Sequence, residues 1–166
     1  MKVLTVLQPW ASLIIHGHKR WEHRSWPTTH RGPLAIHAGR RFGPWQRLLC
    51  EQLPVELALS AAGIRLLSDL PRGFILGAVT VVDCVPAGEL EGGPPLADCG
   101  FAWRLADPVV LPTPVPHRGQ LGLCELPAEI TRILEELLYP TATPTLAGSL
   151  LQRFQRDGLK CRALVS

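Results

Sequence analysis

The sequence has little lysine, and its cysteines are too scattered to form a recognised metal or disulfide motif. Only Lys2, Lys19 and Lys160 are lysines among 17 basic residues. The five cysteines are odd in number and include no CxxC pair, which argues against both a zinc knuckle and a disulfide framework. We therefore expect small buried thiols in a reducing compartment, with no metal ion and no cofactor.

Long apolar runs and the signatures of several enzyme classes are also missing. The longest apolar run, around residues 74–82, is far shorter than a bilayer span, and no signal peptide is recognisable. We accordingly expect a cytoplasmic, soluble protein. The sequence contains no GxxxxGKS/T, GxGxxG, GxSxG or HExxH. Nucleotide hydrolysis, dinucleotide redox chemistry and serine-esterase chemistry are therefore excluded as interpretations.

The opening third of the chain combines positive charge with aromatic rings. Residues 1–50 contain eight lysines or arginines and a single acid, Glu22, whereas the remainder has an excess of acids. The same segment contains five of the six histidines and four of the five tryptophans. A positive surface with flat rings suits a polyanion that has exposed bases, which is the chemistry of a single-stranded nucleic acid.

Periodicity and turn residues predict several strands interrupted by helices in one domain of 166 residues. A two-turn helix is expected to begin at Pro9 and to end at Gly17. Strands are expected at 2–7, 20–26, 34–38, 74–85, 102–111, 119–125 and 159–165, with a loop at 86–100. Helices are expected at 43–59 (interrupted near Pro54), 60–69, 128–139 and 146–156. The alternation is too irregular for a doubly wound sheet. It favours an α+β fold, a small mixed β-barrel flanked by helices, with a core over about 1–126 and a helical extension over 127–166.

Glu22 has two interpretations that the sequence leaves open. In a strand from Arg20 to Trp26, Glu22 and Arg24 lie on one face and form an intrastrand ion pair. Alternatively, Glu22 is a working carboxylate beside Lys19, acting as a general base or accepting a hydrogen bond from a base edge. Trp26, next to Pro27, is the better candidate for an exposed stacking ring, whereas Trp10 suits the core of a helix.

The histidines at positions 16, 23, 30 and 37 recur every seven residues but do not predict a metal site. Glycines and prolines between them rule out one continuous helix, so the four side chains have no shared face. His37, inside a predicted strand, is the one most favourably placed for a functional role.

Five short segments resemble the ASCH domain, a homology domain first noted in an activating-signal cointegrator. These segments are residues 8–11 (QPWA), 17–19 (GHK), 22–26 (EHRSW), 30–32 (HRG) and 36–38 (IHA). Residues 74–77, 82–84 and 101–103 resemble later strands of the same domain, so the resemblance covers about residues 3–125. It implies a PUA-like β-barrel with a cleft thought to bind RNA.

Some members of this family are ribonucleases, and others hydrolyse the amide of N-acetylcytidine. In the amidohydrolase branch, a lysine is followed three residues later by a threonine that is taken to be the nucleophile. Lys19 matches the lysine, but Glu22 occupies the threonine position. The resemblance therefore does not support amide hydrolysis by that route.

Three hypotheses follow for the function. The first is an RNA-binding module in which arginines grip phosphates, Trp26 stacks on a base, and Glu22 with Lys19 reads a base in one cleft. The second is a hydrolase of RNA or a modified nucleoside with Lys19 as electrophile and Glu22 as general base. The third is an interaction module for a small ligand or a protein, with acidic carboxy-terminal helices. Residue chemistry and the resemblance together predict these binding residues: Gln8, Trp10, Lys19, Glu22, Arg24, Trp26, Arg31, Gly32, His37, Arg40 and Arg41.

Overall fold

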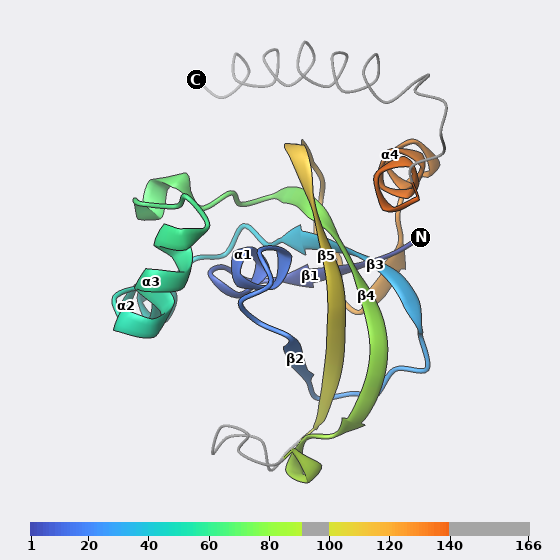
Figure 1. Cartoon of the computed structure of the whole chain (residues 1–166), viewed down its shortest axis with the longest axis horizontal. Coiled ribbons are helices and arrows are strands. Elements are labelled where there is room, and N and C mark those ends of the chain that lie inside the picture. Colours follow the sequence, from blue (N-terminus) through green and yellow to red (C-terminus); the bar gives the residue numbers. More distant parts are fainter. Residues whose placement is uncertain (91–99, 140–166) are drawn as a thin grey trace.

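Six strands form one strongly curled sheet in the computed structural model, which describes residues 1–90 and 100–139. The strand order is β2-β5-β4-β3-β1-β6, and only the β1–β3 pair is parallel (Figure 1). The strands are β1 (Lys2–Val6), β2 (Trp21–Arg24), β3 (Gly32–Ala38), β4 (Phe74–Pro86), β5 (Phe101–Pro116) and β6 (Leu123–Glu125). The helices are α1 (Trp10–Ile15), α2 (Pro44–Cys50), α3 (Leu53–Ala61) and α4 (Ala128–Leu138), with 3-10 turns η1 (Leu67–Asp69) and η2 (Ala87–Glu89). The result is a half-barrel with flanking helices, which confirms the predicted mixed α/β, PUA-like architecture.

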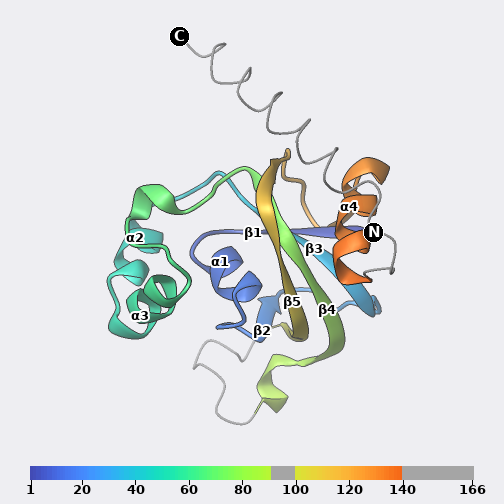
Figure 2. The same ribbon diagram turned by 45° about the horizontal axis from the view of Figure 1, so that its top comes forward.

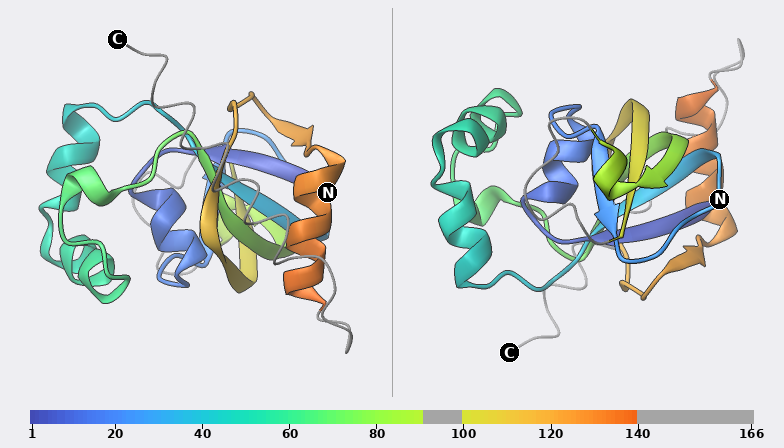
Figure 3. Two further views of the ribbon diagram at one scale, coloured as in Figure 1. Left: turned by 90° about the horizontal axis from the view of Figure 1, so that it is seen from above. Right: turned by 90° about the horizontal axis from the view of Figure 1, so that it is seen from below.

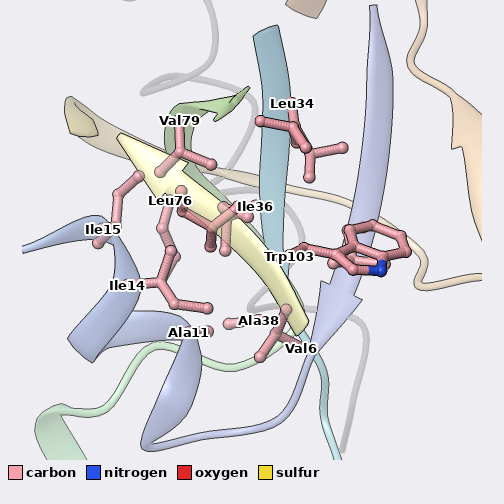
Figure 4. Close-up of a cluster of buried hydrophobic side chains, with 13 residues drawn as sticks. Val6, Ala11, Ile14, Ile15, Leu34, Ile36, Ala38, Leu76, Val79 and Trp103 are labelled. Atoms are coloured by element: carbon pink, nitrogen blue, oxygen red, sulfur yellow. The ribbon is translucent and has the colours of Figure 1, made fainter. Parts of the chain in front are cut away.

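The two faces of the sheet are buried against different helices, as alternation along the strands requires. On the concave face, Ile14 and Ile15 of α1 join a buried cluster with strand residues such as Leu76 (Figure 4). On the other face, α4 covers alternate strand residues such as Val3. Figure 3 shows α1 and α4 on opposite sides of the strands. The first helix of the predicted extension is thus part of the packed structure, while the single-domain boundary at residue 166 stays a prediction.

Helices α2 and α3 form a separate pair beside α1 (Figure 2). They pack through a small apolar cluster that joins Cys50 and Leu59 to Leu13 of α1. The predicted interruption near Pro54 is confirmed, because α2 ends at Cys50 and α3 begins at Leu53. This pair matters for function because α3 supplies one wall of a cleft.

Several predicted boundaries were wrong, each for a local reason. The helix predicted over 60–69 is only the short turn η1, since Ile64 donates to the carbonyl of Leu59 and ends α3. The strand predicted over 119–125 is only β6, because Gly122 has a φ of 75°, which an extended strand cannot accommodate. The strand predicted over 102–111 extends to Pro116, since β5 follows β4 through register shifts. The helix and strand predicted over 146–156 and 159–165 lie outside the described residues, as does most of the predicted loop over 86–100.

Among the described residues, none of the helices has the length and apolarity that crossing a bilayer requires.

Candidate nucleic-acid interface

A cleft of about 710 Å³ lies between α1, the segment that enters β2, and α3. We name it the α1–β2 cleft. Its lining comes from all three elements: Trp10, Leu13, residues 18–23, Pro54, Val55 and Ala58. Three predicted site residues line it, namely Trp10, Lys19 and Glu22. Its volume falls in the range of pockets that bind small ligands, about 300–1,000 Å³.

Gly17 builds the wall of the cleft that carries Lys19. Its φ of 79° ends α1 in the left-handed region, and the amides of His18 and Lys19 both donate to the carbonyl of Leu13. The chain therefore turns back over the end of the helix and enters β2, which pairs antiparallel with β5. The predicted glycine stop after α1 is confirmed, and it places a lysine at the mouth of the cleft.

Glu22 is held by two cations. Lys19 Nζ lies 2.5 Å from Glu22 Oε2, and Arg24 Nη2 lies 2.9 Å from Glu22 Oε1. Lys19 also donates to the carbonyl of Trp21 and lies 5.9 Å from the centre of the Trp10 ring. Glu22 is only 6% exposed, so the carboxylate is largely enclosed by its partners. The intrastrand ion pair expected from strand alternation is present, with Lys19 as a third member and a net charge of +1.

The rings that border the cleft are Trp10 and Trp21. Trp10 is half-buried and contacts two apolar clusters, so it joins the core and the cleft at once. Trp26 packs edge-on against Trp103, with ring centres 4.7 Å apart at 82°. Trp103 is fully buried, so Trp26 packs on the core and does not line the cleft.

His23 also lines the cleft and favours its neutral form. Burial, and then the nearby Lys19 ammonium, lower the pKa of His23 below its usual range. A neutral imidazole can accept a hydrogen bond at one nitrogen and donate one from the other.

A second hollow contains three more of the predicted site residues, His37, Arg40 and Arg41. It has a volume of about 510 Å³ and lies where the ends of β1, β3 and β5 meet. We name it the His37 hollow. Its lining consists of Thr5, Leu7, His37, Gly39, Arg40, Arg41, Arg118, Gly119, Gln120 and Leu121. The single cleft expected from the sequence is therefore two hollows.

The remaining predicted residues lie outside both hollows. Gln8 is fully buried, where its amide donates to the carbonyl of Pro71 and accepts from the amide of Ser12. It therefore positions α1 beneath the cleft. Arg31 pairs with Asp83 at 3.2 Å on the surface, and Gly32 begins β3 beside it. Arg24 connects the hollows, since it also donates to the carbonyl of Thr5.

Sequence reasoning missed several lining residues. Trp21, Arg20 and the α3 residues of the cleft carried no motif that singled them out. Arg118 had a detectable signal: the tripeptide His-Arg-Gly at 117–119 repeats the one at 30–32. Among the described residues, no group of three or more histidine, cysteine or acidic side chains is placed to bind a metal ion.

Comparison with known proteins decides the family. The family model of the ASCH domain matches residues 4–103, which include most of β1, all of β2 to β4 with the cleft residues of β2, and the start of β5. The chain belongs to the ASCH domain family. Activating signal cointegrator 1 from Mus musculus is 32% identical over 132 residues, and that from Homo sapiens is 33% identical over 131 residues. Each alignment covers 76% of this chain but 22% of the relative. This ASCH protein thus corresponds to about a fifth of those relatives, and the resemblance drawn from its motifs is confirmed.

Proposed function

We propose that this ASCH domain binds single-stranded RNA and holds one nucleotide in the α1–β2 cleft. The observation that best supports this is the position of two indole rings beside a carboxylate that two cations hold in place. Aromatic rings stack on bases of any sequence, and the carboxylate and neighbouring backbone offer hydrogen bonds to a base edge. The cleft is large enough for one nucleotide. It can therefore offer that nucleotide both a stacking ring and hydrogen-bond acceptors.

The charges around the cleft suit the phosphates on either side of that nucleotide. Arg20 is exposed at its rim, and Lys19 borders it. Such contacts contribute affinity without reading sequence. Because they depend on released counterions, they make binding sensitive to salt.

The same geometry supports binding more strongly than hydrolysis. Each carboxylate oxygen of Glu22 already contacts a cation, so the carboxylate is tied to Lys19 and Arg24. The ammonium of Lys19 donates both to Glu22 and to the carbonyl of Trp21. For Glu22 to act as a general base and Lys19 as an electrophile, the carboxylate and the ammonium would first have to separate.

Fluorescence anisotropy with a labelled single-stranded RNA tests the proposal. Trp21→Ala removes a ring from the cleft and should weaken binding by about 1–3 kcal/mol, at least fivefold. Trp45→Ala is the matched control, because Trp45 is 66% exposed on α2 and is absent from the lining of the cleft. Equal affinity for both variants would exclude the cleft as the site of stacking.

A salt series separates phosphate contacts from stacking. For a single strand, each neutralised phosphate should contribute about 0.7 to the slope of log affinity against log salt. Arg20→Gln should reduce that slope by about one such step, whereas Arg65→Gln, an exposed arginine beyond the cleft, should not. An affinity that does not change with salt would contradict phosphate binding.

A further inference from the structure

The His37 hollow gathers cations that have no acidic partner within the described part of the chain. Arg40 and Arg41 follow β3, and Arg118 follows β5, yet all three line one space of about 510 Å³. Within residues 1–90 and 100–139, none of these guanidinium groups lies within 4.0 Å of a carboxylate. Three like charges around one hollow repel one another, so an anion bound there would relieve an unfavourable interaction.

His37 fixes the loop that brings Arg118 to the hollow. His37 Nε2 lies 3.1 Å from the carbonyl oxygen of His117, which only accepts, so this nitrogen carries the proton. His37 Nδ1 then accepts from the hydroxyl of Thr5 at 3.2 Å. The same hydroxyl oxygen accepts the amide of Gln120 at 3.3 Å. Four polar groups therefore join residues 117–120 to β1 and β3, and His37 is only 1% exposed.

The segment before β4 completes this arrangement. The amide of Gly73 donates to the carbonyl of Ala38, and its carbonyl accepts from the amide of His117. The side chain of Arg40 runs against Gly73, where an added Cβ would lie 2.8 Å from Arg40 Nε. Three chain segments are thus hydrogen-bonded together, and the arginines lie on a preformed frame rather than on free loops.

Glycine at position 119 keeps the floor of the hollow close to His37. A Cβ at Gly119 would lie 2.7 Å from Cε1 of His37 and 3.2 Å from Cγ2 of Thr5. The loop backbone can therefore lie directly on the imidazole. Any larger residue would move Arg118 relative to Arg40 and Arg41.

We propose that the His37 hollow binds a phosphate monoester, as a site separate from the α1–β2 cleft. A phosphate monoester carries about −1.5 to −2 charges at pH 7, whereas an internal phosphodiester carries one, so the former is the better match for three guanidinium groups. Arginine presents donors in a planar fork that fits phosphate oxygens. Leu7 and Leu121 provide apolar wall for the organic group that bears the phosphate. The shared chemistry allows either the phosphorylated end of a nucleic-acid strand or a free phosphorylated compound.

Isothermal titration of the 166-residue chain tests this site. The probes are inorganic phosphate and a short single-stranded RNA with either a 5′-phosphate or a 5′-hydroxyl. Arg41→Gln and Arg118→Gln should each weaken binding of phosphate by about tenfold or more, as expected for one lost charge-assisted hydrogen bond. Arg65→Gln removes the same charge elsewhere on the surface and should bind phosphate as the parent does.

The outcomes distinguish this site from the proposed function. A preference for the 5′-phosphorylated strand that Arg118→Gln abolishes supports the site with a strand end as ligand. Phosphate binding without that preference supports it with a free compound as ligand. Failure of the parent to bind phosphate, or equal weakening by Arg65→Gln, overturns the inference even if the cleft binds RNA. If phosphate binding is intact but Trp21→Ala binds RNA as tightly as the parent does, the proposed function alone is refuted.

Discussion

Arg24 donates a hydrogen bond from Nη2 to the backbone carbonyl of Thr5 at a distance of 2.9 Å. The same guanidinium nitrogen lies 2.9 Å from Oε1 of Glu22 in the α1–β2 cleft. The hydroxyl of Thr5 faces His37 in the second hollow. One arginine therefore ties an edge strand to β1 and joins the polar groups of two hollows. Its loss would disturb both, so Arg24 is a poor variant for testing either one.

Glu22→Gln should destabilise the protein by about 1–3 kcal/mol. The variant keeps the size of the side chain but leaves Lys19 and Arg24 without a carboxylate in a largely enclosed position. Thermal unfolding monitored by calorimetry measures the effect. Asp83→Asn is the control, since the Arg31–Asp83 pair is exposed and such pairs contribute at most about 1 kcal/mol. If both variants lose the same free energy of unfolding, the buried position of Glu22 does not strengthen its contribution to stability.

The stability of the protein should fall as the pH decreases through about 6.5. Burial is the main cause that lowers the pKa of His37 below its usual range, and the neighbouring His117 and Arg40 lower it further. The hydrogen bond to the carbonyl of His117 raises the pKa but does not offset these effects. The unfolded chain thus takes up a proton near pH 6.5, whereas the folded chain does so only at lower pH. The stabilising contribution is complete above the unfolded pKa and is lost between the two pKa values.

His37→Gln should make this pH dependence shallower. Burial also lowers the pKa values of His16, His23 and His117, so part of the dependence should remain. Midpoints of thermal unfolding at pH 7.5 and 5.5 give the comparison. An unchanged difference between the two midpoints would mean that His37 has the same proton affinity in both states.

Gly77→Ala should destabilise the fold by at least about 2 kcal/mol, through overpacking. A Cβ at Gly77 would lie 2.0 Å from the carbonyl oxygen of Val109 and 2.8 Å from Cδ1 of Ile15. The first of these is backbone, which cannot move aside without disrupting the β4–β5 pairing. Gly88→Ala is the matched control, because nothing lies within 4 Å of an added Cβ there. Chemical denaturation measures both, and similar stabilities would contradict the close packing of α1 against β4.

Local features of the site could be predicted from the sequence because they depend on neighbours in the chain. Strand alternation places Glu22 and Arg24 on one face, and Gly17 ends α1 just before Lys19. Trp26 was harder to predict, because a ring beside a proline at a strand end can lie in solvent or on the core. Its contact with Trp103, 77 positions away, decides the matter.

The amino-acid sequence by itself determined the family, the curled mixed sheet and the basic opening segment, since motif spacing, alternation and composition are properties of the chain. Only the tertiary structure decided that the predicted basic residues separate, with Lys19 in the α1–β2 cleft, Arg40 and Arg41 in the His37 hollow, and Arg31 outside both. His37 meets the loop at 117–120 through the pairing of β3 with β4 and of β4 with β5, whose register shifts set where each strand ends. Such shifts depend on packing between distant segments, and no local pattern encodes which side chains they bring together.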